Sequence, residues 1–339
     1  LYPSEVNLSL TQKIITRGYH VIPADMISAL NFSSHKRDAW HFTQQISSAI
    51  EYSKKNANMY MCLVSCFSCG PDSVAYHLFR QELKGHPFCY LEIDSHTAHA
   101  GFDTRVGAFL DIIEERHRST KEKKSVTPLS AAGLMNQNDH FSPARLSDDE
   151  QYIIDSLGNR VDFNDSRLVF INARPKSRFE SQILKAIYEK RGRTFRTFGR
   201  PDINTLQLSK KVCSGRECIP MISYAGAVIN DIENHKTDDE IAVYLFLDQQ
   251  GPCQNGAWPM VTESFIRRLK AENVICCVER TQKNNYLGFA FDEMVEELKC
   301  MLLSDLFEEA ENTLKCILPN RNGSMHFFYK ACDRFVESL

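Results

Sequence analysis

Short apolar runs alternate with amphipathic segments of helical period along most of this chain. The helical patterns cover residues 4–17, 37–54, 72–83, 104–118, 181–191 and 263–271, and a further helix is expected to begin near Pro220. The apolar runs, each of strand length, cover residues 19–24, 59–65, 88–94, 168–171, 193–198, 241–247 and 274–278. Because strands that alternate with helices in this way form βαβ units, we predict an α/β protein with mostly parallel sheets.

A polar stretch at residues 118–165 interrupts this alternation. It contains a basic run (Lys121, Lys123 and Lys124) that we interpret as a solvated face, and a small hairpin is expected near Gly158. The length of 339 residues is typical of two domains. We therefore predict two flavodoxin/Rossmann-like three-layer domains, with helices filling most of 289–338 as a C-terminal tail. The predicted division is residues 1–117, a polar connector at 118–165, and residues 166–339.

Charge and hydropathy exclude several classes of partner. The chain has 40 basic and 43 acidic side chains, so its net charge of −3 provides no general basic field for nucleic acid or anionic lipid. Its longest apolar runs, such as residues 242–247, fall far short of the roughly 20 residues that a membrane span requires. The first residues lack the features of a signal peptide. We expect a soluble, cytoplasmic protein, and a start without Met suggests a piece of a longer one.

Twelve cysteines are many for a protein in a reducing compartment, where thiols serve as small core residues, metal ligands or redox groups. Most of them lie within apolar strand-like or helix-like patterns, and we expect these to pack in the core. They are Cys62, Cys89, Cys276, Cys277, Cys300, Cys316 and Cys332.

Three other cysteines, Cys69, Cys218 and Cys253, are flanked by Gly or Pro. Each follows a predicted strand or precedes a predicted helix. Ligands bind at the carboxyl edge of open α/β sheets, and helix amino termini favour thiolates and anionic clusters. Three thiolates converging from three loops would suit an iron–sulfur cluster, with one iron left to another ligand.

Other interpretations of these cysteines remain open. Each Gly/Pro-flanked cysteine is also compatible with a plain structural turn. Cys66 and Cys69 form a Cys-x-x-Cys pair of the kind found in thioredoxin-like redox couples, although Gly and Pro usually stand between the two cysteines there. A zinc site would need a fourth ligand, and no histidine lies close to these motifs in the sequence.

The motifs together resemble one family. The segment 67–73 (Phe-Ser-Cys-Gly-Pro-Asp-Ser) and the segment 91–105, with its Asp-x-His and Thr-Arg elements, are similar to motifs of the large activator-related proteins of the 2-hydroxyacyl-CoA dehydratase and benzoyl-CoA reductase system. Residues 214–220 and 251–253 resemble two further motifs in the expected order, and Tyr2-Pro with Asn7 and residues 21–25 also fit. The resemblance covers nearly the whole chain, as the C-terminal portion of such a protein.

The resemblance implies a cluster-bearing, oxidoreductase-like electron-transfer module of anaerobic metabolism. Its ligands would be Cys69, Cys218 and Cys253, holding a 4Fe-4S or double-cubane iron–sulfur cluster, the latter shared across a homodimer. An ATP-hydrolysing activator domain or subunit would donate the low-potential electron, and an acyl-CoA or another small molecule would be the substrate. The ATPase motifs are absent from these residues, so we expect no ATP hydrolysis by this chain alone.

Several positions near the motifs allow two roles. The residues are Asp94, His96, Arg105 and Glu217. In one role they would surround the cluster. In the other they would be structural, as loop caps, helix caps or ion-pair partners, with Arg105 pairing with Asp103 or Asp94.

The chain also departs from the family pattern. Gln254 stands where the family has Arg, His99 replaces an acidic residue, and Cys66 is an additional thiol. The alternative function is therefore a cluster-free scaffold of the same fold that binds an acyl-CoA or a partner protein.

Overall fold

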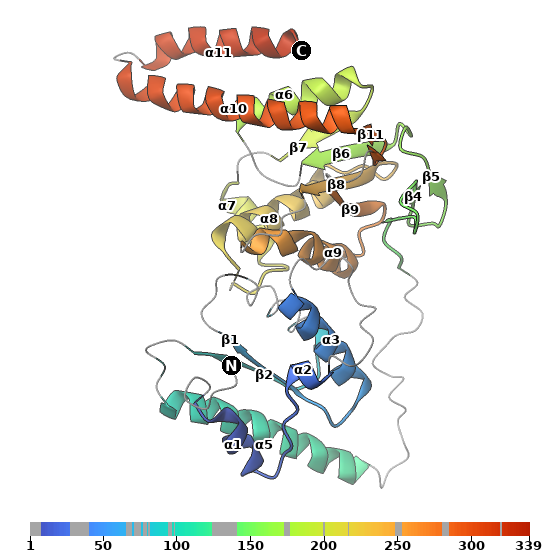
Figure 1. The fold of residues 1–339 in the computed structure, drawn as a ribbon, viewed down its shortest axis with the longest axis vertical. Coiled ribbons are helices and arrows are strands. Elements are labelled where there is room, and N and C mark those ends of the chain that lie inside the picture. The colour runs from blue at the N-terminus through green and yellow to red at the C-terminus, as the bar shows by residue number, and fades with distance from the viewer. Residues whose placement is uncertain are drawn as a thin grey trace. The chain divides into compact units, whose positions relative to one another are not determined.

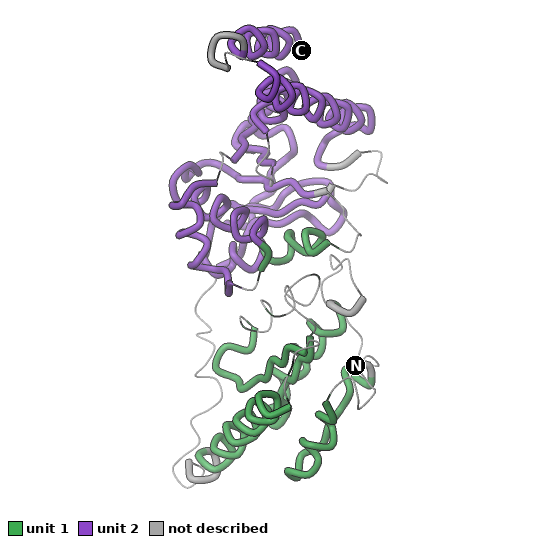
Figure 2. The backbone as a smooth tube through the Cα atoms, turned by 90° about the vertical axis from the view of Figure 1, so that its left-hand side faces the viewer, with its two compact units in different colours: residues 1–140, 216–218, 249–261 green, residues 141–215, 219–248, 262–339 purple. Residues whose placement is uncertain are grey.

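The structure is a computed structural model of the chain. It describes residues 8–27, 41–65, 70, 76, 80, 82–93, 97, 99–123, 141–172, 177–198, 201–215, 217–247, 253–279, 285–318 and 321–339. The chain divides into two compact units (Figure 2). The first unit comprises Leu1–His140, Arg216–Cys218 and Gln249–Val261, and the second comprises Phe141–Gly215, Ile219–Asp248 and Thr262–Leu339.

The first unit contains a parallel pair of strands and a long helix (Figure 1). Strands β1 (Met61–Ser65) and β2 (Phe88–Glu92) pair in parallel. Helix α5 (His99–Lys123) buries one apolar face against the core, where residues three or four apart share a side. That face consists of Phe102, Val106, Phe109, Leu110 and Ile113. The remaining helices are α1 (Leu10–Ile15), α2 (Ala24–Ile27) and α3 (His41–Lys55).

The strand predicted at residues 19–24 is wrong. Residues 19–23 lie outside any strand or helix, and α2 begins at Ala24. Pro23 explains the difference, because proline has no N–H for a strand ladder and its ring favours the start of a helix. Its carbonyl oxygen accepts a hydrogen bond from the backbone N–H of Met26 at 3.0 Å.

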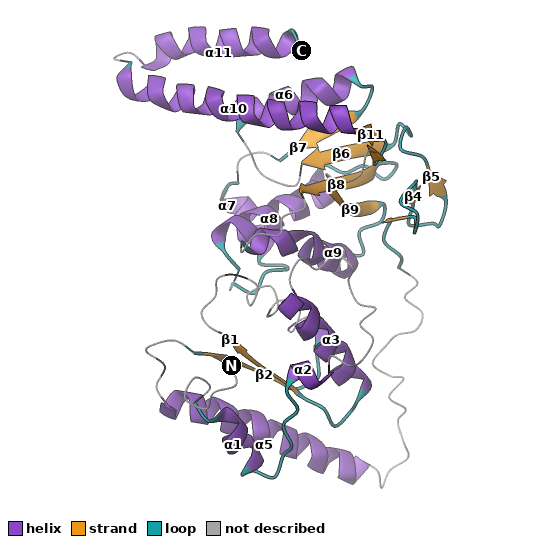
Figure 3. Cartoon of the chain, viewed as in Figure 1, coloured by secondary structure: helices purple, strands orange, loops and turns teal. Residues whose placement is uncertain are grey.

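The second unit is built on a four-stranded parallel sheet with the order β7-β6-β8-β9 (Figure 3). Its strands are β6 (Leu168–Asn172), β7 (Thr194–Thr197), β8 (Ile241–Leu247) and β9 (Val274–Glu279). The first strand in the chain, β6, lies between the second, β7, and the third, β8. The direction of winding therefore reverses between β6 and β8. The connecting helices are α6 (Arg178–Lys190), α7 (Ile203–Ser209), α8 (Ile219–Asn234) and α9 (Trp258–Leu269). The predicted α/β class with mostly parallel sheets is confirmed.

Alternate strand residues of this sheet face opposite layers, as the two-residue period of a strand requires. Phe170 and Val243 belong to a core cluster with Leu184 and Tyr188 of α6. On the other face, the Tyr244 hydroxyl donates to Asp231 of α8 at 2.8 Å. Figure 3 shows α6 on one side of the sheet and α8 and α9 on the other.

The predicted connector is more structured than its composition indicates. Helix α5 extends to Lys123, and three short strands form an antiparallel sheet in the order β3-β4-β5. These strands are β3 (Arg145–Leu146), β4 (Ile153–Ile154) and β5 (Arg160–Val161). The expected hairpin at Gly158 is present, and Ile153 and Val161 are buried in the core of the second unit.

The chain ends in two helices, α10 (Phe291–Ile317) and α11 (Arg321–Glu337), as the sequence predicts. They follow a two-stranded antiparallel pair, β10 (Asn285–Tyr286) and β11 (Phe289–Ala290). Among the described residues, no helix is long and apolar enough to cross a membrane.

Candidate functional site

Cys218 lies directly before α8, as the sequence predicts. The chain reaches it through Gly215, whose φ of +86° is readily adopted only by glycine. The Cys218 thiol is half-buried and forms no disulfide, and the neighbouring Glu217 is buried. Because α8 contains 16 residues, its amino terminus provides the free N–H groups and positive dipole end that stabilise a thiolate.

Cys253 follows β8 and begins the next helical segment. It is the N-cap residue of the 3₁₀ turn η2 (Gln254–Ala257), which continues into α9 at Trp258. Its thiol is exposed and forms no disulfide.

Both cysteines lie in the connections around β8, Cys218 before α8 and Cys253 after β8. Strand β8 ends at Leu247, six residues before Cys253. Helix α8 leads back to the amino end of β8, so the first turn of α8 lies toward the carboxyl edge of the sheet, and Cys218 directly precedes that turn in the chain. Strand β8 is also one of the two strands between which the winding reverses. In open α/β sheets the carboxyl edge beside such a reversal is where ligands bind.

The remaining predicted ligand, Cys69, lies outside the described residues, as do Cys66, Asp94 and His96. The strands that precede them are described. Ser65 at the end of β1 pairs with Glu92 at the end of β2, so the chain leaves two adjacent strands at one edge. The segments that contain Cys218 and Cys253, Arg216–Cys218 and Gln249–Val261, group with Leu1–His140 in the first unit.

Arg105 and His99 are both on α5. His99 is the first residue of the helix, and the exposed Arg105 lies within it. The expected pairing of Arg105 with Asp103 is not seen, because Asp103 forms an ion pair with Lys13.

Cys62 and Cys89 lie opposite each other in neighbouring strands, and their thiols are hydrogen-bonded. This hydrogen bond lowers the pKa of Cys89, to which the charge of Arg105 also contributes, while the same hydrogen bond and burial raise the pKa of Cys62.

Most of the cysteines expected in the core are there. Cys89, Cys276, Cys277, Cys300 and Cys332 are buried and Cys62 is half-buried, but Cys316 is exposed and that prediction is wrong. Cys316 lies near the end of α10, where the apolar pattern of the helix continues past Ser304, the last of its buried residues.

Gln254 provides a test of whether the residues fit a bound group. Its side chain is only 3% exposed, and its Oε1 atom has no hydrogen-bond partner. A buried amide atom without a partner is costly, so the position of this carboxamide next to Cys253 suits a group that would bond to it. The oxygen and nitrogen of an amide are interchangeable by rotation, so the same end of Gln254 is able to donate an N–H to a thiolate or sulfide sulfur.

The described residues supply part of the expected ligand set. Within them, no three His, Cys, Asp or Glu side chains lie close enough together to hold a metal ion. They contribute the thiols of Cys218 and Cys253, neither of which forms a disulfide, and the third position of the predicted set belongs to Cys69.

The second unit also has a polar cavity of about 300 Å³ between β7, α7 and α8. Arg196 lies in its wall and forms hydrogen bonds with Glu240 (Nη1 to Oε2, 2.9 Å) and Asp231 (Nη2 to Oδ2, 3.0 Å). Burial opposes the charge of Arg196, but the two carboxylates outweigh it and raise its pKa above the ordinary value. The sequence contains one signal of this cluster, an arginine inside the predicted strand 193–198, and that signal alone does not predict the pairing with Asp231 and Glu240.

The lining of this cavity is largely satisfied from within. Asp202 caps α7 by accepting from the N–H and hydroxyl of Thr205, both at 2.8 Å, and His235 Nδ1 contacts the Asn230 carbonyl at 3.2 Å. It is the cavity's size of about 300 Å³ and its mostly polar lining that suit a small polar molecule.

Comparison of the chain with protein-family models, with curated proteins and with solved structures finds no match.

Proposed function

We propose that this chain is an iron–sulfur electron-transfer module of an ATP-driven activator/dehydratase-type system and forms part of a longer protein. The observation that carries the proposal is the position of Cys218 and Cys253, two thiols that form no disulfide and stand at the starts of helical segments in the connections of a parallel sheet. The resemblance of the surrounding motifs to the 2-hydroxyacyl-CoA dehydratase activator-related family supports the same function. The strand order of the second unit supports a flavodoxin-like fold for it, and we extend this proposal to the first unit.

In this proposal Cys69, Cys218 and Cys253 hold the cluster as thiolates. When bound, the cluster would supply one-electron transfer at low potential. The amino termini of α8 and of the η2–α9 segment stabilise the negative charge of the thiolates. Gln254 would be placed to donate a hydrogen bond to a sulfur atom of the bound group, and hydrogen bonds of this kind raise a cluster's reduction potential. The electron would come from an ATP-hydrolysing activator domain or subunit and pass to an acyl-CoA or another small substrate.

A second candidate function is a cluster-free binding module in the cytoplasm. The cavity of about 300 Å³ beside α7 and α8 favours it, because this cavity would take a small polar molecule without any metal.

The deciding experiment measures iron and acid-labile sulfide per chain after anaerobic reconstitution, together with the visible spectrum. Wild-type protein is expected to hold about four irons per chain, as for one 4Fe-4S cluster. The variants Cys69→Ser, Cys218→Ser and Cys253→Ser should each lose most of the iron, because each removes one thiolate ligand. Cys316→Ser is the matched control, since Cys316 is also exposed but lies in α10.

Iron-free wild-type protein, or equal iron loss in Cys316→Ser and Cys253→Ser, would contradict the cluster proposal. In that case, ligand binding in the polar cavity becomes the function to test.

A further inference from the structure

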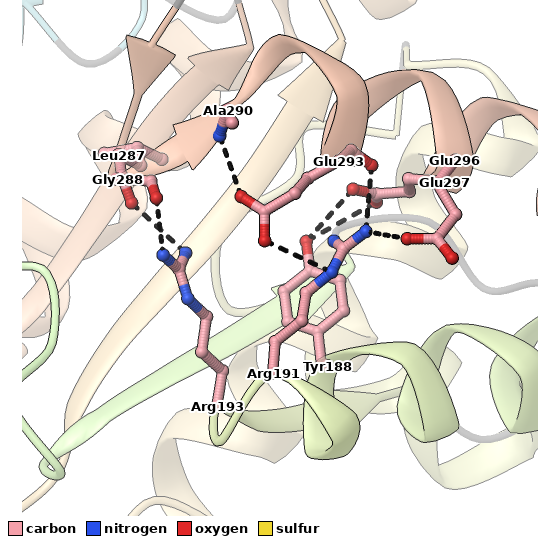
Figure 4. Close-up of polar contacts among 9 residues, drawn as sticks. All are labelled: Tyr188, Arg191, Arg193, Leu287, Gly288, Ala290, Glu293, Glu296 and Glu297. Carbon is pink, nitrogen blue, oxygen red and sulfur yellow. Dashed lines mark hydrogen bonds and ion pairs between the residues drawn. The ribbon is translucent and has the colours of Figure 1, made fainter. Parts of the chain in front are cut away.

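Helix α10 is fixed to the second unit by its inner face. The Tyr188 hydroxyl donates to the buried Glu297 carboxylate at 3.3 Å (Figure 4). Arg191 donates to the Glu293 carbonyl at 3.2 Å and also forms an ion pair with the Glu296 carboxylate. Figure 4 shows these groups converging from α6 and α10.

The segment before α10 is held in the same way. Arg193 donates to the carbonyl oxygens of Leu287 (3.3 Å) and Gly288 (2.7 Å), and its guanidinium lies 3.8 Å from the centre of the Phe289 ring. These contacts set the rotation of α10 about its axis and therefore determine which side chains face outward.

The outward side of α10 carries a continuous apolar stripe. It consists of Phe291, Val295, Leu298, Leu302 and Leu306, and we call it the outer stripe. Val295 is half-buried, and the other four side chains of the stripe are between 49% and 61% exposed. The spacing of four, three, four and four residues places them on one side of the helix, opposite the buried Glu297, Cys300 and Ser304. At 1.5 Å per residue the outer stripe is about 22 Å long.

Acidic side chains flank the outer stripe. Asp292, Asp305 and Glu309 are all exposed, and no ion pair is found for them among the residues that the structure describes. Lys299 is the basic residue on the same side of the helix. The flanks therefore carry an excess of negative charge around a row of large apolar side chains.

We propose that the outer stripe docks an amphipathic helix of a partner protein whose apolar face is flanked by Lys or Arg. An exposed row of apolar side chains on a well-anchored helix is typical of an interaction surface. Apolar side chains spaced three or four residues apart lie on one face of a helix, and two helices bind each other through such faces. The acidic flanks select a basic partner. A second copy of the chain would bring acidic flanks together, and an anionic lipid surface would be repelled.

The test uses two designed helical peptides of about 18 residues with identical leucine stripes, one flanked by lysine and one by glutamate. Binding to the full chain is measured by fluorescence anisotropy at low and high salt. We expect the lysine peptide to bind at least about tenfold more tightly than the glutamate peptide, with the difference shrinking at high salt. The double substitution Asp305→Lys, Glu309→Lys should reduce or reverse the preference.

Substitutions in the outer stripe complete the test. Leu302→Gln should weaken lysine-peptide binding about tenfold, whereas the control Leu157→Gln should not change it. Leu157 is suitable because it is 81% exposed and belongs to the hairpin between β4 and β5, not to α10. Circular dichroism of both variants confirms that they fold, which is expected for exposed side chains.

Four outcomes would overturn the proposal: no binding of the lysine peptide, equal binding of both peptides, an unchanged affinity in Leu302→Gln, or self-association of the chain that Leu302→Gln abolishes. The last of these would assign the outer stripe to a second copy. None of these outcomes bears on the iron content, so this proposal and the cluster proposal fail independently.

Discussion

At the residue scale, Gln254 is a buried polar residue with an unmet hydrogen-bond requirement. It is next to the exposed Cys253, and its Oε1 has no hydrogen-bond partner. We predict that Gln254→Leu stabilises the metal-free protein by about 1 kcal/mol, because the substitution removes an unsatisfied buried amide of similar size. Urea unfolding of metal-free protein measures this change.

The matched control is Gln254→Glu, which should destabilise the same protein because it places a carboxylate at a buried position. A loss of stability in Gln254→Leu would mean that the amide has a partner in solution, and the argument for a bound group at this position would then fail.

Asp155 gives a pH-dependent prediction at the same scale. Its buried carboxylate accepts hydrogen bonds from the N–H groups of Leu157 (3.0 Å) and Asn159 (2.7 Å). Burial raises the pKa of this carboxyl group, but the hydrogen bonds outweigh it and lower the pKa below its ordinary value. The carboxylate therefore stabilises the folded chain above the unfolded pKa of about 4, and this contribution disappears as the pH falls through the lower folded pKa.

Asp155→Asn should accordingly cost about 1–2 kcal/mol at pH 7 and progressively less between about pH 4 and pH 2. Unfolding by urea at several pH values measures the difference. Asp162→Asn in the same region is the control, because Asp162 is exposed and forms a surface ion pair with Arg160, for which the expected effect is small. A cost of Asp155→Asn that does not change with pH would contradict the assignment.

At the scale of elements, the packing of α7 against α8 depends on one glycine. A Cβ atom at Gly226 of α8 would lie 1.9 Å from the backbone carbonyl oxygen of Thr205 in α7. Because backbone cannot rotate away as a side chain does, we predict that Gly226→Ala destabilises the chain by about 3 kcal/mol. Thermal or urea unfolding measures this loss.

Gly101 in α5 is the matched control. It is also a helical glycine, but a Cβ there would meet nothing within 4 Å, so Gly101→Ala should be neutral or stabilise by about 0.5 kcal/mol. If both alanine variants behaved alike, the close approach of α7 and α8 would be incorrect.

The elements also show what local pattern predicts well. Strand β8 and strand β9 were predicted within a residue at each end, because fully buried parallel strands are continuous apolar runs. The short helix α7 was not predicted, since its seven residues contain no apolar stripe long enough to distinguish it from a loop. Its start is instead defined by a capping box between Asp202 and Thr205.

At the scale of the whole molecule, the chain passes repeatedly between its two units, and both described candidate ligands belong to segments that the first unit takes from the middle of the sequence. A cluster held by Cys69, Cys218 and Cys253 would tie these segments together in the folded state only. We therefore predict that anaerobic reconstitution raises the unfolding temperature by about 5 °C or more.

Calorimetry with and without iron measures this shift. Cys253→Ser should abolish the increase, and Cys316→Ser should retain it. An unchanged unfolding temperature in a protein that does hold iron would mean that the metal is bound without the three cysteines acting together.

The sequence by itself determined the α/β class, the parallel strands and the helical end of the chain, because these follow from local hydrophobic periodicity. It also identified Cys218 as a residue before a helix and Cys253 as a residue after a strand. Only the tertiary structure decided that Ile153 and Val161 of the polar connector are core residues, and that Cys316 is exposed. It also decided that Arg196 pairs with Asp231 and Glu240, and that the outer stripe of α10 faces outward. The physical reason is that burial and ion pairing depend on which distant segments come together, and no local period contains that information.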